Sequence, residues 1–289
     1  MRRTSIRVLR WVMTPRVVLI LITTVGLASC GGSASSGASP TPRPVGITIM
    51  DTTPPPGVNV PGAHWIKIVG AGGVATSEQI AAVFRPSGEG PFPLVVELHG
   101  SGGLKDVDVK WAARLAAAGF ITVAGCWESS TVPPYTFPFY ELTLTFIACP
   151  KLLVRSIDAT AALIAAGRKQ PGVRTDAVGL YGMSDGGAAA EEVIAARQDI
   201  RAAALDSPAG GPEASRINAP VLVLAGTADD YVSFTAQKDY VEALQRAGKD
   251  VEWHYYQGGR HTLILDPANK DDAISRIIDF FTRRLKAGT

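Results

Sequence analysis

No Asp or Glu occurs before Cys30, and this absence changes how the net charge is interpreted. The whole chain has 28 basic and 26 acidic residues, a formal charge of +2. Without the five arginines that precede Cys30, the remainder has 23 basic residues against 26 acidic ones, or about −3. That balance offers no basic surface of the kind that nucleic-acid binding requires, so we expect no nucleic-acid partner. The five arginines are Arg2, Arg3, Arg7, Arg10 and Arg16.

The N-terminus also lacks an apolar run long enough to cross a bilayer. Its run, Val17–Ala28, has about a dozen residues, whereas a transmembrane helix needs about 20. The basic start, this run and the small residues after it are together typical of an export signal. The run ends in Leu27-Ala28-Ser29-Cys30, which resembles the lipobox of bacterial lipoprotein signal peptides.

The lipobox resemblance implies a signal peptide over residues 1–29, cleavage before Cys30 and lipidation of its thiol. We therefore expect an exported, extracytoplasmic protein that is lipid-anchored to a bacterial membrane. An uncleaved anchor and an ordinary secretory signal are the alternatives, and Met13 is an alternative start to Met1. Residues 30–62 are rich in Gly, Ser, Pro and Thr, which predicts a flexible tether ahead of a folded domain over 63–289.

Cysteine is scarce, and once Cys30 is assigned to lipid only Cys126 and Cys149 remain. Neither has a Cys-x-x-Cys partner or a nearby His, so no zinc site is expected. In an exported protein this pair predicts a disulfide that would stabilise the fold by about 3 kcal/mol, with two separate buried thiols as the alternative. The aromatic and proline-rich segment between them matches neither a helix nor a strand. It is either a substrate loop at the carboxyl edge of the sheet or a cover for that edge.

No internal repeat is present, and strands alternate with helices along residues 63–289. This order predicts an α/β fold with a mostly parallel, doubly wound sheet of about eight strands and helices on both faces. Two short strands open the domain as an antiparallel pair, and the later strands are almost continuously apolar, as in a sheet covered on both faces. The expected strands are His64–Val69, Ile80–Arg85, Leu94–His99, Phe120–Gly125, Ala177–Tyr181, Arg201–Leu205, Val221–Ala225 and Val251–Tyr256. The expected helices are Val107–Ala118, Leu152–Gly167, one that starts directly after Ser184, Thr235–Ala247 and Ile274–Leu285.

Two acidic positions within these elements are interpreted as structural. Glu97 interrupts the apolar strand Leu94–His99, and we expect it to face a polar edge or to pair locally rather than to act in catalysis. Glu191 and Glu192 follow the serine motif on the next helix, where we expect a solvated face.

A glycine-rich stretch, His99-Gly100-Ser101-Gly102-Gly103, comes directly after the strand Leu94–His99. Glycines at the end of a strand let the backbone turn and bring N–H groups close to a ligand, as an oxyanion hole requires. A plain glycine-rich turn is the alternative. The position of the stretch, one helix-strand-helix unit before the serine motif, favours the oxyanion hole.

The motif Gly182-Met183-Ser184-Asp185-Gly186 follows the expected strand Ala177–Tyr181. The pentapeptide Gly-x-Ser-x-Gly alone is weak evidence, since roughly 0.2 chance occurrences are expected in this composition. The strand before it and the small residues after it, which let a helix start against that strand, favour a nucleophile elbow. Because a serine hydroxyl is a poor nucleophile until a base takes its proton, a histidine and a carboxylate must lie nearby.

Histidine is also scarce, and its four copies are the candidates for the base. His64 lies in the opening strand, His99 ends the strand before the glycine-rich stretch, where a structural role is expected, and His254 lies within the last strand. His261 instead follows that strand on a glycine-containing loop, so we expect it to be the base.

The carboxylate partner has three candidates. Asp229 and Asp230 follow the strand Val221–Ala225, and either could accept the histidine Nδ1–H. Asp206, after the preceding strand, is the rival. The order Ser184, Asp, His261 is the nucleophile, acid, histidine order of α/β-hydrolases.

These motifs resemble those of serine α/β-hydrolases of the dienelactone-hydrolase type. The resemblance covers the chain from about His64 onward and implies the α/β-hydrolase fold. In that family's pattern the acid precedes a valine by three residues, which implies Asp229, with Val232, rather than Asp230. It also implies an oxyanion hole made by the backbone N–H groups of Asp185 and Ser101. The matching stretches are His99-Gly100-Ser101, Gly182-Met183-Ser184-Asp185-Gly186, Gly226-Thr227-Ala228-Asp229 and Gly259-Arg260-His261.

The expected function is hydrolysis of a small-molecule carboxylic ester by Ser184, His261 and Asp229 through an acyl-enzyme, with no metal or cofactor. The family's namesake has a cysteine nucleophile, so its lactone specificity does not transfer to Ser184. Trp127 and Tyr231, each beside a loop at the strand ends, are expected to contact substrate. A peptidase of the prolyl-oligopeptidase type, or a catalytically inert surface-binding protein with a hydrolase fold, are the alternatives.

Overall fold

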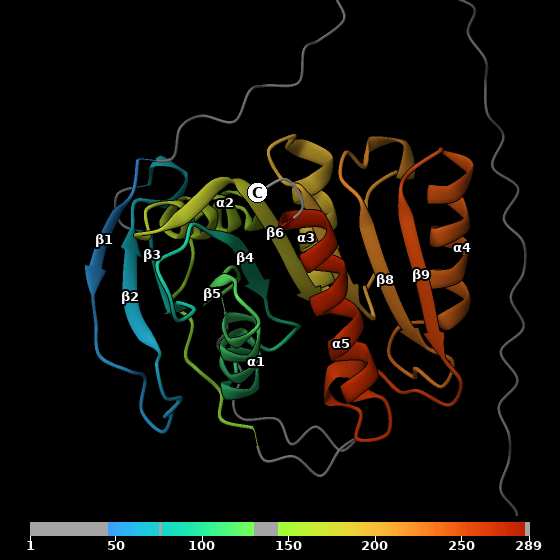
Figure 1. Cartoon of the computed structure of the whole chain (residues 1–289), viewed down its shortest axis with the longest axis horizontal. Helices are drawn as coiled ribbons and strands as arrows, with labels where there is room; N and C mark the ends of the chain where they lie inside the picture. The colour runs from blue at the N-terminus through green and yellow to red at the C-terminus, as the bar shows by residue number, and fades with distance from the viewer. Residues whose placement is uncertain (1–45, 75–76, 130–143, 287–289) are drawn as a thin grey trace, which may run out of the picture. The chain divides into compact units, whose positions relative to one another are not determined.

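One nine-stranded sheet with helices on both faces forms the folded domain (Figure 1). The computed structural model describes residues 46–74, 77–129 and 144–286. The predicted signal peptide, the Leu27-Ala28-Ser29-Cys30 stretch and the first part of the predicted tether lie outside these residues, so the predictions made for them stay predictions. Within the described ranges, no helix is long and apolar enough to cross a membrane.

The sheet is antiparallel at one side and parallel over the rest, which confirms the predicted mostly parallel architecture. β1, β2, β3 and β5 pair antiparallel in turn, and the strands from β5 to β9 run parallel to one another. In sheet order the strands are β1 (Thr48–Asp51), β2 (His64–Val69), β3 (Glu78–Phe84), β5 (Ile121–Gly125), β4 (Phe92–Leu98), β6 (Val173–Met183), β7 (Ala202–Asp206), β8 (Val221–Gly226) and β9 (Val251–Tyr256).

Five helices bury the two faces of the sheet, and Figure 1 shows α1 and α5 on the near side. These two are α1 (Asp106–Ala117) and α5 (Lys270–Phe281), whereas α2 (Ser156–Arg168), α3 (Asp185–Ala196) and α4 (Phe234–Arg246) pack on the opposite face. Because the central strands are covered on both faces, their apolar residues are continuous rather than alternating. Because β5 to β9 run parallel, their carboxyl ends lie at one edge of the sheet, and the loops that follow them lie there too.

The first strand, β1, shows that the predicted tether is too long. Thr48–Asp51 pairs antiparallel with β2, and Ile47 and Val58 are buried, at 8% and 5% exposure. Ile47-Thr48-Ile49-Met50 is a β-branched, apolar run between proline clusters, which is a pattern typical of a strand. The prediction of a flexible tether over residues 30–62 is therefore wrong from Ile47 onward, because this run covers the antiparallel edge of the sheet.

Helix α2 begins later than the predicted start at Leu152. Arg155, the residue before the helix, has an extended backbone with φ −67° and ψ 153°. Leu153 consequently lies outside the helix and is 58% exposed. Its apolar side chain fitted the helical spacing, but it does not reach the core.

Cys126 and Cys149 form a disulfide, as the sequence predicts, with their Cα atoms 5.5 Å apart. The bond ties the end of β5 to the segment that leads into α2. Residues 130–143 of the enclosed loop lie outside the described ranges, so the role of this loop in substrate binding stays a prediction.

Glu191 contradicts its predicted place on a solvated helix face. Its side chain on α3 is fully buried, at 0% exposure, because α3 packs between the sheet and its neighbouring helices. Burial raises the pKa of the Glu191 carboxyl to about 8, although the nearby hydroxyl of Tyr240 on α4 opposes this shift. Glu191 is therefore protonated in the native state at neutral pH.

Glu191 makes stability depend on pH. Above the ordinary carboxyl pKa of 4.5 the unfolded chain releases this proton while the native state keeps it until about pH 8. The native state binds more protons over that window, so stability falls as pH rises. Because one pKa unit corresponds to about 1.4 kcal/mol, Glu191→Gln should reduce the loss of unfolding free energy across this window by a few kcal/mol.

Urea unfolding at a series of pH values from about 5 to about 9 measures this effect. Glu192→Gln is the matched control, because Glu192 is the next residue on the helix and is exposed. The wild type and Glu192→Gln should lose stability in parallel, whereas Glu191→Gln should lose less. Identical slopes for all three proteins would contradict the assignment.

Candidate active site

Ser184 occupies a sharp turn between β6 and α3. β6 ends at Met183 and α3 begins at Asp185, so Ser184 alone joins the two elements. Its backbone dihedral angles, φ 52° and ψ −119°, lie in a region that residues other than glycine rarely adopt. This strand-turn-helix geometry is the one expected of the predicted nucleophile elbow, and the role of Ser184 as nucleophile stays a prediction.

The two glycines of the motif are needed for close backbone approach. A methyl group on Gly182 would overlap the carbonyl oxygen of Gly186, and a methyl group on Gly186 would overlap the carbonyl oxygen of Leu98 at the end of β4. Gly182 and Gly186 therefore let α3 start directly against β6 and β4. The packing places Ser184 at the carboxyl edge of the sheet.

Two further strained residues lie on neighbouring loops at the same edge. Among the described residues, Ser184, Ser207 and Thr262 are the non-glycine residues with positive φ, at 52°, 52° and 63°. Ser207 follows β7, Thr262 follows His261, and the Thr262 N–H donates to Ser207 Oγ at 3.0 Å. Strained backbone persists only where surrounding contacts fix it, and such residues gather at functional sites.

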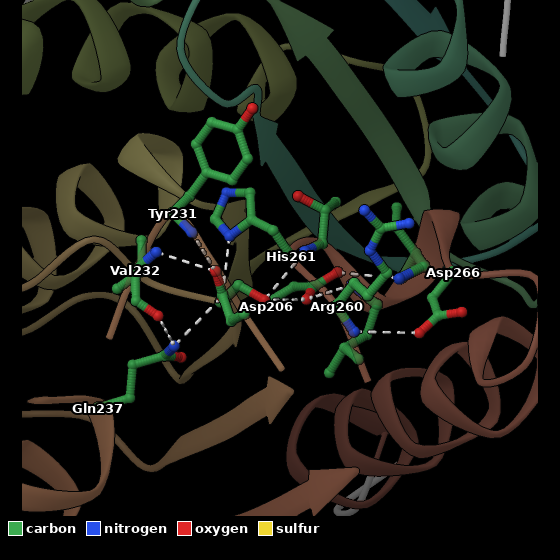
Figure 2. Close-up of polar contacts among 12 residues, drawn as sticks. Asp206, Tyr231, Val232, Gln237, Arg260, His261 and Asp266 are labelled. Carbon is green, nitrogen blue, oxygen red and sulfur yellow. Dashed lines mark hydrogen bonds and ion pairs between the residues drawn. The ribbon is translucent and has the colours of Figure 1, made fainter. Parts of the chain in front are cut away.

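A hydrogen bond joins His261 to Asp229 at this edge. Figure 2 shows His261 beside Tyr231 and Val232, the two residues that follow Asp230. His261 Nδ1 lies 2.9 Å from Asp229 Oδ2, and the two side chains are 6% and 0% exposed. Asp229 follows β8 and His261 follows β9, so adjacent parallel strands bring them together. The carboxylate accepts only, so Nδ1 carries the proton and Nε2 is left as the basic nitrogen.

Backbone N–H groups hold the Asp229 carboxylate in place. Its Oδ1 accepts from the N–H of Tyr231 at 3.0 Å and from that of Val232 at 2.9 Å. Burial would raise the pKa of Asp229, but the hydrogen bond and charge of His261, together with these N–H groups, outweigh burial and hold the pKa below its ordinary value. Asp230 is exposed, so the geometry favours Asp229 over Asp230 as the partner of His261.

Asp206, the rival carboxylate, binds the loop after His261 instead of the histidine ring. Its side chain is fully buried and accepts from the N–H groups of Leu263 at 2.8 Å and Ile264 at 3.1 Å. Its main-chain carbonyl accepts from the Ser184 N–H at 2.9 Å. Asp206 therefore ties the serine turn and the histidine loop to the end of β7.

The other three histidines have different surroundings. His64 is exposed on β2 and lies 2.9 Å from Asp51. His254 lies on β9, 3.8 Å from Asp272 on α5. His99 is fully buried at the end of β4, where its Nδ1 is 2.9 Å from the Gly100 carbonyl oxygen. These contacts agree with the structural role expected for His99.

The glycine-rich stretch after β4 lies directly against the serine turn. A methyl group on Gly100 would lie 3.4 Å from Ser184 Cβ, in van der Waals contact. Ser101, the next residue, is exposed, and Asp185 is the first residue of α3, where helix N–H groups carry partial positive charge. Ser101 and Asp185 thus belong to the two segments that meet at Ser184, and their part in an oxyanion hole stays a prediction.

His99 orients the Ser101 N–H through the intervening peptide. Because the Gly100 carbonyl accepts, His99 Nδ1 is the donor, and a planar trans peptide directs the Ser101 N–H away from that carbonyl. Burial lowers the pKa of His99 to about 3, partly opposed by this hydrogen bond and assisted by the charge of Lys105. The ring is therefore neutral at physiological pH.

Both predicted substrate contacts lie beside these groups. The ring of Tyr231 stacks on that of His261, with centroids 5.2 Å apart, and Tyr231 is 55% exposed. Trp127 is 5% exposed, and its Nε1–H donates to the His99 carbonyl at 3.0 Å. Contact of either residue with substrate stays a prediction. Among the described residues, no cluster of three metal-ligating side chains is present.

The sequence matches the family model described as the dienelactone hydrolase family over residues 80–285. The chain belongs to the dienelactone hydrolase family. It is therefore a hydrolase by family, and its mostly parallel sheet with the serine at a strand-helix turn is the α/β-hydrolase fold of that family. No curated protein matches the sequence significantly.

Solved structures similar to this dienelactone hydrolase family member share its fold at low sequence identity. A putative dienelactone hydrolase from Klebsiella pneumoniae subsp. pneumoniae is 17% identical with a TM-score of 0.60, over 82% of this chain and 99% of that one. The dienelactone hydrolase-like promiscuous phosphotriesterase P91 from metagenomic libraries is 19% identical with a TM-score of 0.61, over 82% and 98%. Acylaminoacyl peptidase from Pyrococcus horikoshii is 15% identical with a TM-score of 0.57, over 73% and 40%.

The sequence did not reveal the residues that brace this family member's site. Asp206 was considered only as a competing acid, and no part was expected for Ser207, Thr262 or the buried Lys105. The positive φ of Ser207 and Thr262 could not be predicted from the sequence, because neither residue is a Gly or an Asn, the types that commonly adopt it. A signal was present at Asp206, because an acid that directly follows a buried strand must find hydrogen-bond donors there.

Proposed function

We propose that this hydrolase cleaves carboxylic esters, with Ser184 as nucleophile, His261 as general base and Asp229 as its acidic partner. The observation that carries the proposal is the 2.9 Å hydrogen bond from His261 Nδ1 to a buried Asp229. It fixes the tautomer that leaves Nε2 able to take a proton from a serine hydroxyl. Ser184 supports the proposal through its elbow geometry beside the oxyanion loop.

The mechanism follows from these positions. Ser184 Oγ attacks the ester carbonyl carbon while His261 Nε2 takes the hydroxyl proton, and the carbonyl π electrons move onto oxygen. The N–H groups of Ser101 and Asp185 stabilise this oxyanion. Collapse breaks the ester bond, and His261 returns the proton to the leaving alkoxide, which departs as an alcohol. Water, deprotonated by His261, then attacks the acyl-enzyme, and the acid is released as Ser184 regains its proton.

Asp229 supports both steps without exchanging a proton. Its lowered pKa keeps it ionised, so it stabilises the imidazolium that forms on His261 in each half-reaction. No step of this acyl transfer needs a metal or cofactor. The exposed ring of Tyr231, stacked on His261, is proposed to contact the substrate, and Trp127 to line the site behind His99.

The peptidase alternative is tested beside the esterase proposal. The acylaminoacyl peptidase from Pyrococcus horikoshii, matched over 40% of its length, shares the fold with this chain. A peptide-amide panel assayed beside the ester panel separates the two activities. Turnover of neither class, with an intact fold, would instead favour the catalytically inert binding protein.

The proposal predicts stoichiometric labelling of Ser184 by a fluorophosphonate and turnover of p-nitrophenyl esters. Ser184→Ala should abolish labelling and lower kcat by about 10⁶-fold, to the assay background, because no hydroxyl remains to form the acyl-enzyme. Ser129→Ala is the matched control, since Ser129 lies in the segment after β5 and takes no part in the proposed chemistry. Ester turnover retained in Ser184→Ala would reject the proposal.

We further propose that lipidated Cys30 anchors the mature protein to a bacterial membrane, on the strength of the lipobox. Full-length protein expressed in a bacterium should partition into the membrane fraction. Cys30→Ala should prevent lipid attachment and leave that fraction depleted, measured by fractionation and by the mass of the N-terminal peptide. An unchanged partition with an unlipidated N-terminus would contradict the anchor.

A further inference from the structure

A buried lysine, Lys105, hydrogen-bonds to the loop between β4 and α1. Lys105, the residue before α1, is 4% exposed. Its Nζ donates to the main-chain carbonyl of Gly103 at 2.7 Å and to that of Ser101 at 3.2 Å. These carbonyls belong to the glycine-rich stretch that lies against Ser184.

A role for Lys105 in forming α1 does not explain this arrangement. An ammonium group has no lone pair, so Lys105 cannot accept a hydrogen bond from the first N–H groups of the helix. The side chain of Asp108 performs the local task, because it accepts from the Lys105 N–H at 2.6 Å. The Lys105 side chain instead turns back toward the preceding loop, where its Nζ also lies 5.6 Å from the ring centroid of Phe146.

Buried carboxyl groups accommodate the positive charge of Lys105. Burial raises the pKa of Asp108 to about 6, and the charge of Lys105 opposes that shift. Burial and the charge of Asp108 raise the pKa of Glu97 well above its ordinary value, again opposed by Lys105. Glu97 is fully buried on the interior strand β4, so its expected place at a polar edge is wrong. The ammonium thus donates to the loop carbonyls, and its charge favours the ionised forms of two buried acids.

We propose that Lys105 is a positioning residue for the oxyanion hole, an inference that rests on the proposed ester hydrolysis. Ser101 lies between two peptide units, and the carbonyl of each is bound. His99 Nδ1 binds the carbonyl of the unit before Ser101, and Lys105 Nζ binds the carbonyl of the unit after it. Because a peptide unit is planar and trans, the bond to the Gly100 carbonyl sets the direction of the Ser101 N–H. The bond from Lys105 to the Ser101 carbonyl holds the next unit, so it limits the backbone rotation of Ser101 that would turn this N–H away.

Lys105 also adds a fixed positive charge near the place where the oxyanion develops. Glu128, just after the disulfide cysteine Cys126, has a raised pKa because of burial and the charge of Asp185, and Lys105 lowers it. The field of Lys105 thus reaches a carboxyl group that also interacts with the residue after Ser184. Interactions aimed at charge that appears only in the transition state raise kcat rather than substrate affinity.

Lys105→Met tests the proposal, because it keeps the length of the side chain and removes both donors and charge. With a p-nitrophenyl ester, kcat should fall by about 10- to 100-fold and KM should change by less than about twofold. Affinity for a phenylboronic acid, whose tetrahedral adduct with Ser184 places an oxygen in the oxyanion hole, should fall in the same proportion as kcat. Lys110→Met is the control. Lys110 is an exposed lysine on α1, and its side chain pairs with that of Asp106. Lys110→Met should match the wild type in all three quantities.

Lys105→Gln keeps the test valid if Lys105→Met does not fold. Its amide retains a donor for the Gly103 carbonyl but has no charge, so kcat should fall several-fold with KM unchanged. A folded variant with wild-type kcat and boronate affinity, or one whose loss lies in KM alone, would overturn the proposal. Absence of ester turnover in the wild type would reject the proposed function itself. Wild-type turnover with inactive Ser184→Ala and unaltered Lys105→Met would reject only the role of Lys105.

Discussion

The hydrogen bond between His261 and Asp229 is the interaction on which the candidate site depends. It exists because β8 and β9 are adjacent and parallel, so the loops after them meet at one edge of the sheet. Asp229 can remain ionised in a buried position because two backbone N–H groups and His261 surround it. Asp206 then holds the chain after His261 and the Ser184 N–H to the end of β7. The proposed catalytic groups are thus fixed by rigid strands rather than by loops alone.

The sequence predicted the fold well wherever local pattern and tertiary packing agree. The strands His64–Val69 and Val251–Tyr256 have the predicted bounds, and the parallel order follows from alternating strands and helices. The errors arose where long-range packing decides. β1 was not predicted because its four residues lie between proline-rich stretches, which suggested a tether, and only their pairing with β2 makes them a strand. Glu191 was placed on a solvated face because its burial depends on how α3 packs in the finished fold.

The site was predictable to the extent that chemistry constrains residue type and order along the chain. Ser184 and His261 could be selected because each follows a strand on a turn that contains glycine. Choosing Asp229 over Asp230 needed the family pattern, and the structure supplies its physical reason in the Val232 N–H that binds the carboxylate. Lys105 could not be selected, because a lysine before a helix indicates an exposed charge unless its buried partners are known.

The measurement that tests the account most directly is the kcat of Asp229→Asn compared with that of Asp230→Asn. In Asp229→Asn the amide oxygen should stay on the N–H groups of Tyr231 and Val232. Its NH2 group then faces His261 Nδ1 and donates to it, so His261 should adopt the wrong tautomer. The account predicts that kcat for a p-nitrophenyl ester falls by about 10³- to 10⁴-fold in Asp229→Asn. Asp230→Asn, an exposed neighbour, should keep the wild-type value. Equal kcat values in the two folded variants would contradict the proposed triad.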